Sequence, residues 1–266
     1  MLAWLDFGWR LLGTGFCFLA FGIGGAIMGL VLFPLVMLLP GTTAARSRRV
    51  QRIIRAGFRL FLGTVRFLGI GDISVVNGHL LSCEGRKLVL ANHPTLLDVV
   101  VVMSLMPQAD CVVKQALWRN PFLGRVVRGA GYVSNSSPEK VLEGCHRLLE
   151  KDRALVLFPE GTRSVPGQAL AFQRGAARLV LRSGAPVQPV TVTCEPATLM
   201  KHTKWYRIPP HRWHIRVMAH QPVSRNELLA AQDIPEPAAV RRMTTALQDL
   251  FERKLVEHEN AYQRIA

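Results

Sequence analysis

The chain carries no charged side chain from Leu11 to Ala45. This run is longer than the ~20 apolar residues needed to cross a bilayer once, and it is too long for the core of a signal peptide. We therefore expect residues 1–45 to be a hydrophobic membrane anchor. Pro34 and the many glycines leave two arrangements open, a single tilted span or two short helices that form a hairpin in one leaflet, and we favour the hairpin.

Glycines within this run have two interpretations. Gly25 and Gly29 have the small-xxx-small spacing that lets two helices approach closely. Gly22 and Gly24 have part of the pattern of a dinucleotide-binding loop, but no strand precedes them. We therefore interpret these glycines as positions of helix packing and not as a cofactor site.

The residues that follow the apolar run are strongly basic. The chain has a formal net charge of +15, which indicates an anionic partner such as a membrane surface or nucleic acid. Between residues 46 and 70 the arginines are Arg46, Arg48, Arg49, Arg52, Arg55, Arg59 and Arg66, and no acidic residue occurs before Asp72. Apolar residues recur there at helical spacing, so we expect residues 46–70 to form an amphipathic helix on the membrane surface.

Such a basic cluster beside an apolar segment marks the cytoplasmic side and binds anionic headgroups. It predicts a protein of the inner (cytoplasmic) membrane whose remaining residues face the cytoplasm. The alternative is a solvated linker helix with an arginine face.

From Ile73 onward, short apolar runs alternate with helical patterns, which is typical of an α/β domain. We predict a single domain over residues 71–266, with a mixed sheet flanked by helices. The expected strands are 73–76, 88–91, 111–113, 132–133, 154–158, 187–193 and 213–219, the last a candidate edge strand. The expected helices are 96–106, 121–128, 138–151, 175–183, a short one opened by the capping box Ser224-Arg-Asn-Glu227, and a closing helix from Pro237.

The segment 92–98 reads NHPTLLD and follows the apolar strand at 88–91. Pro94 suits the first position of a helix. Two side chains five residues apart on one helix point about 140° away from each other, so His93 must lie on the loop and Asp98 in the first turns if they are to meet. A carboxylate on one imidazole nitrogen fixes the tautomer and leaves the other nitrogen free as a base. The alternative is a buried histidine that caps the helix.

Two further motifs follow at the ends of expected strands. Residues 158–164 read FPEGTRS, and residues 185–190 read APVQPV, a strand entered and interrupted by prolines. With these motifs the chain resembles the lysophospholipid acyltransferases of the 1-acylglycerol-3-phosphate acyltransferase (PlsC-like) family, whose motifs are NHxxxxD, FPEGTRS and a proline-flanked strand. The resemblance spans residues 73–193 and identifies 71–266 as an α/β catalytic domain of the glycerolipid acyltransferase type.

The resemblance implies transfer of a fatty acyl group from acyl-CoA or acyl carrier protein to a hydroxyl of a lysophospholipid. By default the acceptor would be 1-acylglycerol-3-phosphate and the product phosphatidate. His93 would be the base and Asp98 would orient it, with no acyl-enzyme, and no GxSxG nucleophile elbow occurs in the sequence. No cofactor is expected besides the acyl donor. A non-catalytic membrane-binding protein of the same fold is a competing hypothesis, which the intact motifs oppose.

The FPEGTRS loop offers a set of groups that suits a phosphate: Gly161 with exposed backbone N–H groups, the Thr162 hydroxyl and the Arg163 guanidinium. In the family this motif is associated with the glycerol phosphate of the acceptor, which makes Glu160 to Arg163 candidate substrate-binding residues. The alternative is that Glu160 and Arg163 pair with each other and pin the loop.

One position departs from the family. The family has a motif of the form GxxFIxR, and residues 129–135 here read GAGYVSN, so that Asn135 stands at the arginine position. Asparagine offers no charge to a phosphate. Either Lys114, Arg125 or Arg128 takes over, or the acceptor is different, such as an amino-acid lipid, a polyene or a glycolipid. Lys114 resembles a lysine of the family at that place; the alternative is a solvated surface lysine.

A late cluster between residues 201 and 214 mixes basic and aromatic residues: Lys201, His202, Lys204, Trp205, Tyr206, Arg207, His211, Arg212, Trp213 and His214. This mixture favours a membrane interface. Single-stranded nucleic acid would suit the same residues, but no nucleic-acid fold motif accompanies them, so we expect membrane lipids and no nucleic acid as partners. An irregular basic loop is a third possibility. The histidines and the five cysteines lack the spacing of a metal site, so we predict no metal.

Overall fold

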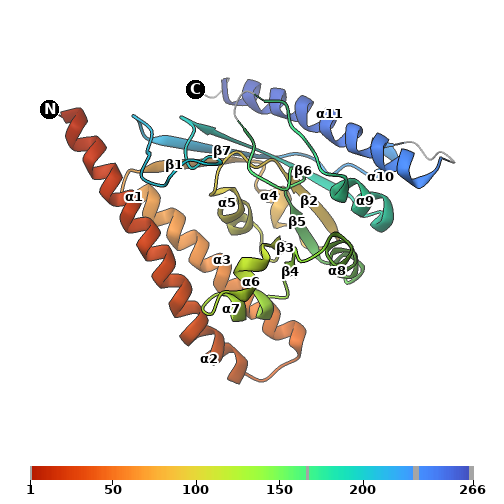
Figure 1. The fold of residues 1–266 in the computed structure, drawn as a ribbon, viewed down its shortest axis with the longest axis horizontal. Coiled ribbons are helices and arrows are strands. Elements are labelled where there is room, and N and C mark those ends of the chain that lie inside the picture. The colour runs from red at the N-terminus through yellow and green to blue at the C-terminus, as the bar shows by residue number, and fades with distance from the viewer. Residues whose placement is uncertain (1, 166–167, 230–233, 264–266) are drawn as a thin grey trace.

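The computed structural model describes residues 2–165, 168–229 and 234–263. Its centre is a seven-stranded sheet with the order β1-β7-β6-β2-β5-β3-β4 (Figure 1). The strands are β1 (Gly71–Val76), β2 (Lys87–Ala91), β3 (Asp110–Val113), β4 (Val133–Ser134), β5 (Ala154–Leu157), β6 (Val187–Glu195) and β7 (Trp213–Ala219). All neighbours are parallel except β6 and β7. The prediction of an α/β fold with a mixed sheet is confirmed.

The prediction of an edge position for 213–219 is wrong. Strand β7 lies between β1 and β6, and β1 forms the edge. The register pairs Gly71 with Trp213, and a Cβ on Gly71 would lie 2.2 Å from the indole ring. The glycine is therefore needed for this pairing, and the alternating pattern of β7 reflects its two different faces, not exposure.

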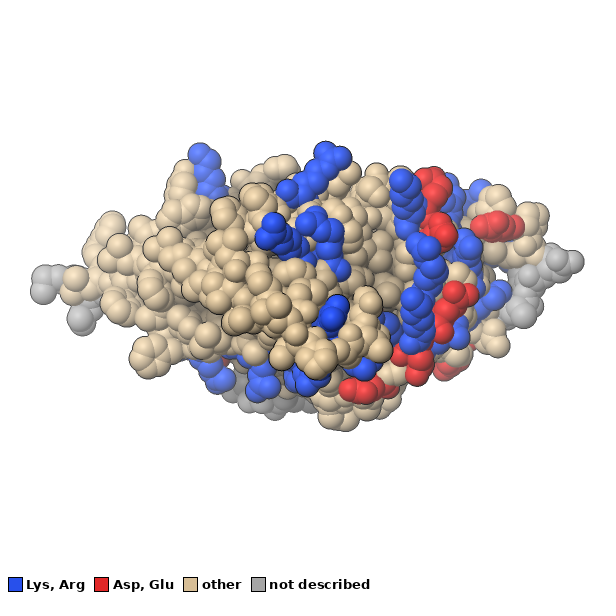
Figure 2. All heavy atoms as spheres, turned by 90° about the horizontal axis from the view of Figure 1, so that it is seen from below, with Lys and Arg blue, Asp and Glu red and all other residues tan. Residues whose placement is uncertain are grey.

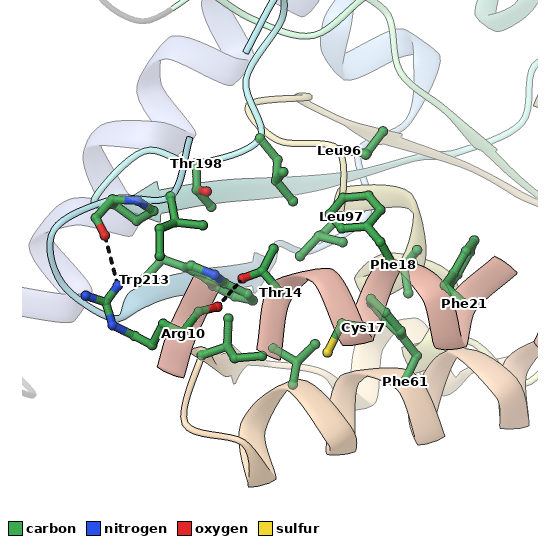
Figure 3. A pocket seen from close by; sticks show the side chains of 16 residues that line it. Arg10, Thr14, Cys17, Phe18, Phe21, Phe61, Leu96, Leu97, Thr198 and Trp213 are labelled. Carbon is green, nitrogen blue, oxygen red and sulfur yellow. Dashed lines mark hydrogen bonds between the residues drawn. The ribbon is translucent and has the colours of Figure 1, made fainter. Parts of the chain in front are cut away.

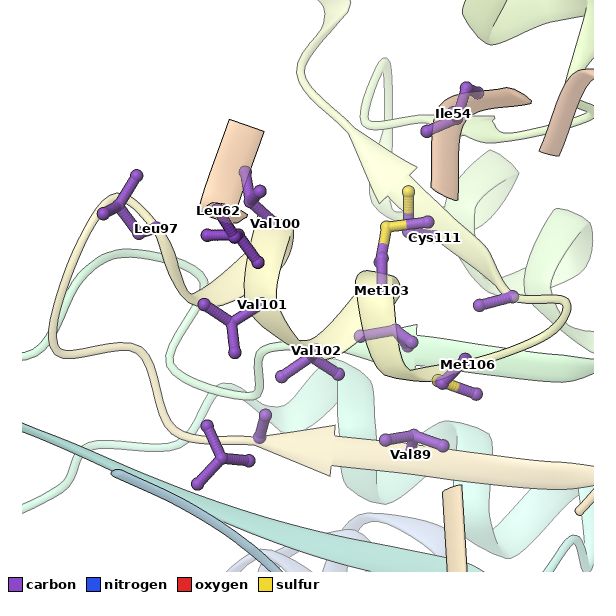
Figure 4. Packing of buried hydrophobic residues seen from close by; sticks show 14 of the residues in the cluster. Ile54, Leu62, Val89, Leu97, Val100, Val101, Val102, Met103, Met106 and Cys111 are labelled. Carbon is purple, nitrogen blue, oxygen red and sulfur yellow. The ribbon is translucent and has the colours of Figure 1, made fainter. Parts of the chain in front are cut away.

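Two hydrophobic cores lie on the two faces of the sheet. Strand β2 contributes to both, because successive side chains of a strand point to opposite faces. Val89 and Ala91 pack with α3 (Thr43–Phe67) and α5 (Asp98–Leu105), and Figure 4 shows Val89 beneath the side chains of this layer. Leu88 and Leu90 pack with α8 (Pro138–Glu150), α9 (Arg174–Ser183) and α11 (Glu236–Gln263). Burial on both faces explains the unbroken apolar run of this strand.

Four short helices complete the domain. They are α4 (His79–Ser82), α6 (Gln115–Arg119), α7 (Gly124–Gly129) and α10 (Arg225–Leu228). The capping box predicted at Ser224 and Glu227 is confirmed, with both hydrogen bonds formed. The closing helix α11 is also confirmed. Near its end, His258 is fastened to the sheet through Thr191, whose Oγ1 lies 2.7 Å from His258 Nδ1 and 2.9 Å from His220 Nε2.

The apolar N-terminal run does not form a hairpin of two short helices. The helix α1 (Leu2–Ile27) continues through a π-helical segment, η1 (Met28–Leu32), into α2 (Phe33–Leu38). The π segment ends two residues before Pro34, whose missing N–H disrupts the regular helical ladder. By length and composition, the helix over Trp4–Leu38 could cross a membrane. Its antiparallel partner is the basic helix α3 (Figure 1).

The N-terminal helix is fastened to the domain near both of its ends. Near its start, Trp9 Nε1 donates to the Leu68 carbonyl at 2.9 Å, and Arg10 donates to the carbonyls of Pro209 and Pro210. Near its end, a Cβ on Gly29 would lie 1.9 Å from the carbonyl oxygen of Phe122. The helix-packing interpretation of Gly29 is thereby confirmed, and the helix lies along the domain over most of its length.

The outward face of this helix is apolar. Its exposed large side chains include Trp4, Leu5, Leu12, Phe16, Leu19, Ile23, Ile27, Leu30, Leu35 and Leu38. On α3, by contrast, the apolar side packs on the domain, where Gln51 donates to Asp110 and to the Ala130 carbonyl, and Arg48, Arg52, Arg59 and Arg66 are exposed. Seen from below, acidic side chains gather toward one end of the molecule among basic ones, and the rest of this face is largely uncharged with scattered basic side chains (Figure 2).

Candidate active site

The two polar residues of the NHPTLLD segment meet where β2 ends. His93 Nδ1 lies 2.9 Å from Asp98 Oδ2, and the Thr95 backbone N–H donates to the same oxygen at 2.8 Å. Helix α5 begins at Asp98. The helix predicted over 96–106 is present but begins two residues later, and Pro94 does not occupy its first position, because residues 94–97 form a turn that brings the carboxylate back toward the imidazole.

The environment of this pair is asymmetric. Asp98 is fully buried, and burial raises the pKa of its carboxyl to about 6, while the hydrogen bond from His93 works in the opposite direction. The His93 side chain is 16% exposed, and its ring lies against Phe158 with the ring centroids 4.4 Å apart. An ionised Asp98 can only accept, so Nδ1 carries the proton and Nε2 has a free lone pair. Within the described part of the chain, Nε2 forms no hydrogen bond.

The loop after β5 holds His93 from the other side. Glu160 Oε1 accepts from the His93 backbone N–H and from the Ser164 hydroxyl, both at 2.9 Å. The Ser164 N–H donates to the His93 carbonyl at 2.7 Å. Glu160 and Arg163 do not pair with each other, so that alternative is wrong. The two motif loops instead form one rigid unit around the imidazole.

Asn92 ties the same loop to β6. Its side-chain amide donates to the Val192 carbonyl at 2.8 Å, and its Oδ1 accepts from the Val192 N–H at 2.7 Å. The role of Asn92 was not predicted from the sequence. Its position directly before His93 in the motif was the available signal.

Arg163 is directed toward a different segment. Its Nη1 donates to the carbonyls of Leu199 at 2.6 Å and Met200 at 2.8 Å. Gly161 has φ +68°, which a glycine adopts without strain, and both Gly161 and Thr162 are exposed. The Arg163 guanidinium is therefore bound to backbone carbonyls, while Gly161 and Thr162 are open to solvent.

Lys114 and Asn135 lie next to each other at the ends of β3 and β4. Asn135 Oδ1 accepts from the Gln115 backbone N–H at 2.7 Å, and Lys114 is exposed at the start of α6. Asn135 thus stabilises the turn into α6.

A cleft of about 420 Å³ separates these residues from the FPEGTRS loop. Asn135, Phe158, Gly161, Gln173 and Arg178 line it together with apolar side chains of α8 and α9. Arg178 was not identified from the sequence. Its place one turn into the helix that follows the FPEGTRS loop is the signal that could have indicated it.

An apolar cavity of about 190 Å³ lies on the side of the NHPTLLD loop that faces α1. Leu96, Leu97 and Val100 line it from the α/β domain, and Cys17 and Phe18 line it from α1. Figure 3 shows these side chains around the cavity and Arg10 at one end. Among the described residues, no three His, Cys, Asp or Glu side chains lie together as a metal site would require.

Comparisons with known proteins agree with this geometry. Residues 72–193 match the acyltransferase family. The 1-acyl-sn-glycerol-3-phosphate acyltransferase of Helicobacter pylori is 31% identical over 115 residues, which cover 41% of this chain and 48% of that protein. Over residues 72–193, this chain is thus similar in sequence to the acyltransferases. The aligned part spans 37% of the length of the coconut relative (Cocos nucifera), which is 29% identical over 116 residues.

A longer alignment exists with the mouse 1-acyl-sn-glycerol-3-phosphate acyltransferase alpha, which is 27% identical over 215 residues, covering 78% of this chain and 73% of the mouse protein. The fold is also that of the crystal structure of the 1-acyl-sn-glycerophosphate (LPA) acyltransferase PlsC from Thermotoga maritima. The TM-score is 0.62 at 19% identity, covering 91% of this chain and 96% of the other. The α/β acyltransferase fold therefore extends over nearly all of the chain.

Proposed function

We propose that this chain transfers a fatty acyl group from acyl-CoA or acyl carrier protein to a hydroxyl of a lysophospholipid, with His93 as general base. The observation that carries the proposal is the 2.9 Å contact between His93 Nδ1 and the buried Asp98, which leaves Nε2 free. The acyltransferase match over residues 72–193 supports the same chemistry.

The reaction follows from these groups. The acceptor hydroxyl attacks the thioester carbonyl carbon while His93 Nε2 takes the hydroxyl proton. The tetrahedral intermediate then collapses with cleavage of the carbon–sulfur bond, and the imidazolium returns its proton to the departing thiolate. Asp98 holds the tautomer and stabilises the imidazolium. The ester forms directly, so no acyl-enzyme is required.

The acceptor by default is 1-acylglycerol-3-phosphate, which would give phosphatidate. The cation for its phosphate would come from Arg178 in the cleft, with Lys114 near Asn135. Arg163 can contribute only if it leaves the carbonyls of Leu199 and Met200. A phosphate-free acceptor is the second candidate, because the cleft carries Asn135 where the family has arginine and is lined mainly by apolar side chains.

The same proposal extends to location and organisation. Residues 1–45 serve as the membrane-associated part, residues 46–70 contribute the basic surface, and residues 71–266 are the catalytic domain, on the cytoplasmic face of the inner membrane. The exposed arginines of α3 support this orientation.

The test uses detergent-purified full-length protein with acyl-CoA or acyl carrier protein and a panel of lysolipids, and follows products by mass spectrometry. His93→Ala should lower the rate by at least about a hundredfold. The matched control is His146→Ala, a histidine of α8 outside the site, which should retain activity. Transfer that survives His93→Ala unchanged contradicts the base assignment. A strong preference for phosphate-free acceptors would favour the second candidate.

A further inference from the structure

The segment between β6 and β7 connects the catalytic loops to the N-terminal helix. Leu199 accepts hydrogen bonds on its carbonyl from the Leu96 N–H at 3.2 Å and from Arg163 at 2.6 Å. At the other end of the segment, Arg10 of α1 donates to the carbonyls of Pro209 and Pro210. This segment, residues 198–212, is thus held by both motifs and by α1.

The inner side of the segment closes the apolar cavity. Thr198, Leu199, Ile208 and Pro209 line it opposite α1 and α3. Leu199 has φ +50° and is buried, a backbone conformation that side chains other than glycine rarely adopt. Such strain persists only where the surroundings hold it, and it is frequent at ligand clamps. We call residues 198–212 the lid, because their inner side covers the cavity.

The outer side of the lid has the opposite character. Lys201, Lys204 and Arg207 are exposed, and between them Trp205 and Tyr206 are 45% and 46% exposed. No acidic residue occurs in the sequence from residue 196 to 226. Tryptophan and tyrosine beside basic residues are the composition of a surface that sits among lipid headgroups.

The outer side is also continuous with the apolar face of α1. The Trp205 ring packs on Phe18 with centroids 5.8 Å apart, and it lies over Gly15, where a Cβ would be 3.4 Å from the ring. Phe16 and Leu19, the neighbours of these α1 residues, are exposed. The basic and aromatic outer side of residues 198–212 therefore adjoins the apolar face of α1 at Trp205.

We propose that the outer face of residues 198–212 docks on an anionic bilayer surface, so that the apolar cavity beneath this lid takes up a fatty chain directly from the bilayer. The docking requires no catalysis, but the identity of the chain as an acyl substrate rests on the proposed function. Two readouts separate these claims.

The first readout is the depth of the lid in a membrane. Tyr206→Cys, labelled with a fluorophore in a background with the accessible Cys83 and Cys194 replaced by serine, is placed in vesicles whose lipids carry brominated chains. Quenching should be strong with phosphatidylglycerol present and weaker in pure phosphatidylcholine or at high salt. Lys201→Gln, Lys204→Gln and Arg207→Gln together should reduce it.

The matched control removes three exposed cations elsewhere, with Lys151→Gln, Arg241→Gln and Arg253→Gln, and should leave quenching unchanged. A label at Leu19→Cys on α1 serves as the reference. Absence of quenching at residue 206 in anionic vesicles overturns the proposal, whether or not residue 19 is quenched. Equal quenching with and without the three lid cations also overturns it.

The second readout is the rate of acyl transfer to long-chain lysolipid in phosphatidylglycerol vesicles, divided by the rate with a monomeric short-chain substrate. The lid variant should lower this ratio by about tenfold, because each basic side chain near an anionic surface contributes to binding, and the control variant should not. An unchanged ratio contradicts chain uptake beneath the lid. If the wild type transfers no acyl group to either substrate, the proposed function fails and the quenching result still decides the docking.

Discussion

Ionisation of the Asp98 carboxyl, on which the role of His93 as a base depends, is disfavoured by burial. Asp98 is fully buried, and only the His93 ring and the Thr95 N–H offset the loss of water around its Oδ2. Its Oδ1 has no hydrogen-bond partner among the described residues. Burial of this kind favours the neutral acid, which explains why the pKa of Asp98 is raised.

This raised pKa predicts an acid limit to activity. Below about pH 6 the Asp98 carboxyl takes up a proton, and a protonated carboxyl no longer accepts from His93 Nδ1–H or stabilises an imidazolium. We expect kcat/KM to fall as the pH drops through this value, and Asp98→Asn to lower the rate by a hundredfold or more at pH 7. A pH–rate profile measures both. Asp249→Asn, an exposed position on α11, is the control. An Asp98→Asn enzyme within a few-fold of wild type would contradict the assignment.

The pairing of His93 with Asp98 was predictable from the sequence, because the two residues are five positions apart and directly follow a strand. The contacts of Arg163 were not. Its partners, Leu199 and Met200, lie 36 and 37 positions later in the sequence, in a segment without helix or strand. No periodicity relates such positions, so only the fold brings them together.

Among the elements, the positions of the strands and long helices were predictable from apolar periodicity. The continuous helix formed by the N-terminal run was not. Pro34 and the glycines suggested a break, but a π-helical turn at residues 28–32 accommodates the proline without ending the helix. Gly25 and Gly29 are positions of helix packing, whereas a Cβ on Gly22 or Gly24 would meet no neighbouring atom within 4 Å, so the packing interpretation is wrong for those two. Gly29 meets Phe122 of the α6–α7 connection, and Gly129 meets Phe33, where a Cβ would lie 2.1 Å from the ring.

Substitution by alanine is therefore expected to change the stability of the protein differently at two glycines of the same helix. Gly29→Ala places a methyl group against the Phe122 carbonyl and should destabilise the protein by about 1–3 kcal/mol, as overpacking does. Gly22→Ala meets nothing within 4 Å and should be neutral or slightly stabilising, because alanine favours the helix. Thermal unfolding in detergent measures both. Equal unfolding temperatures for the two variants would show that α1 does not pack on the domain at Gly29.

In the whole molecule, the long N-terminal helix packs along the α/β domain and does not stand apart from it. The composition predicted a membrane-associated segment and a separate domain, and the sequence could not show that the two pack lengthwise. That packing depends on Trp9, Arg10 and Gly29, whose partners lie at residues 68, 209–210 and 122. An amphipathic or apolar pattern gives the face that a helix buries but not the surface on which it is buried.

This lengthwise packing decides between a span and an interfacial helix. A span would carry the adjoining domain surface into hydrocarbon, including the exposed arginines of α3, which the bilayer core disfavours. We therefore expect the helix over Trp4–Leu38 to lie in the plane of one leaflet, with both ends on the same side. A cysteine in a tag added ahead of Met1 and, separately, Thr43→Cys report the two ends in the background without Cys83 and Cys194. In sealed inside-out vesicles, both should react with a membrane-impermeant maleimide without permeabilisation. Reaction of one end only after detergent is added would establish a span and would require the contacts of Arg10 or Gly29 to open in the membrane.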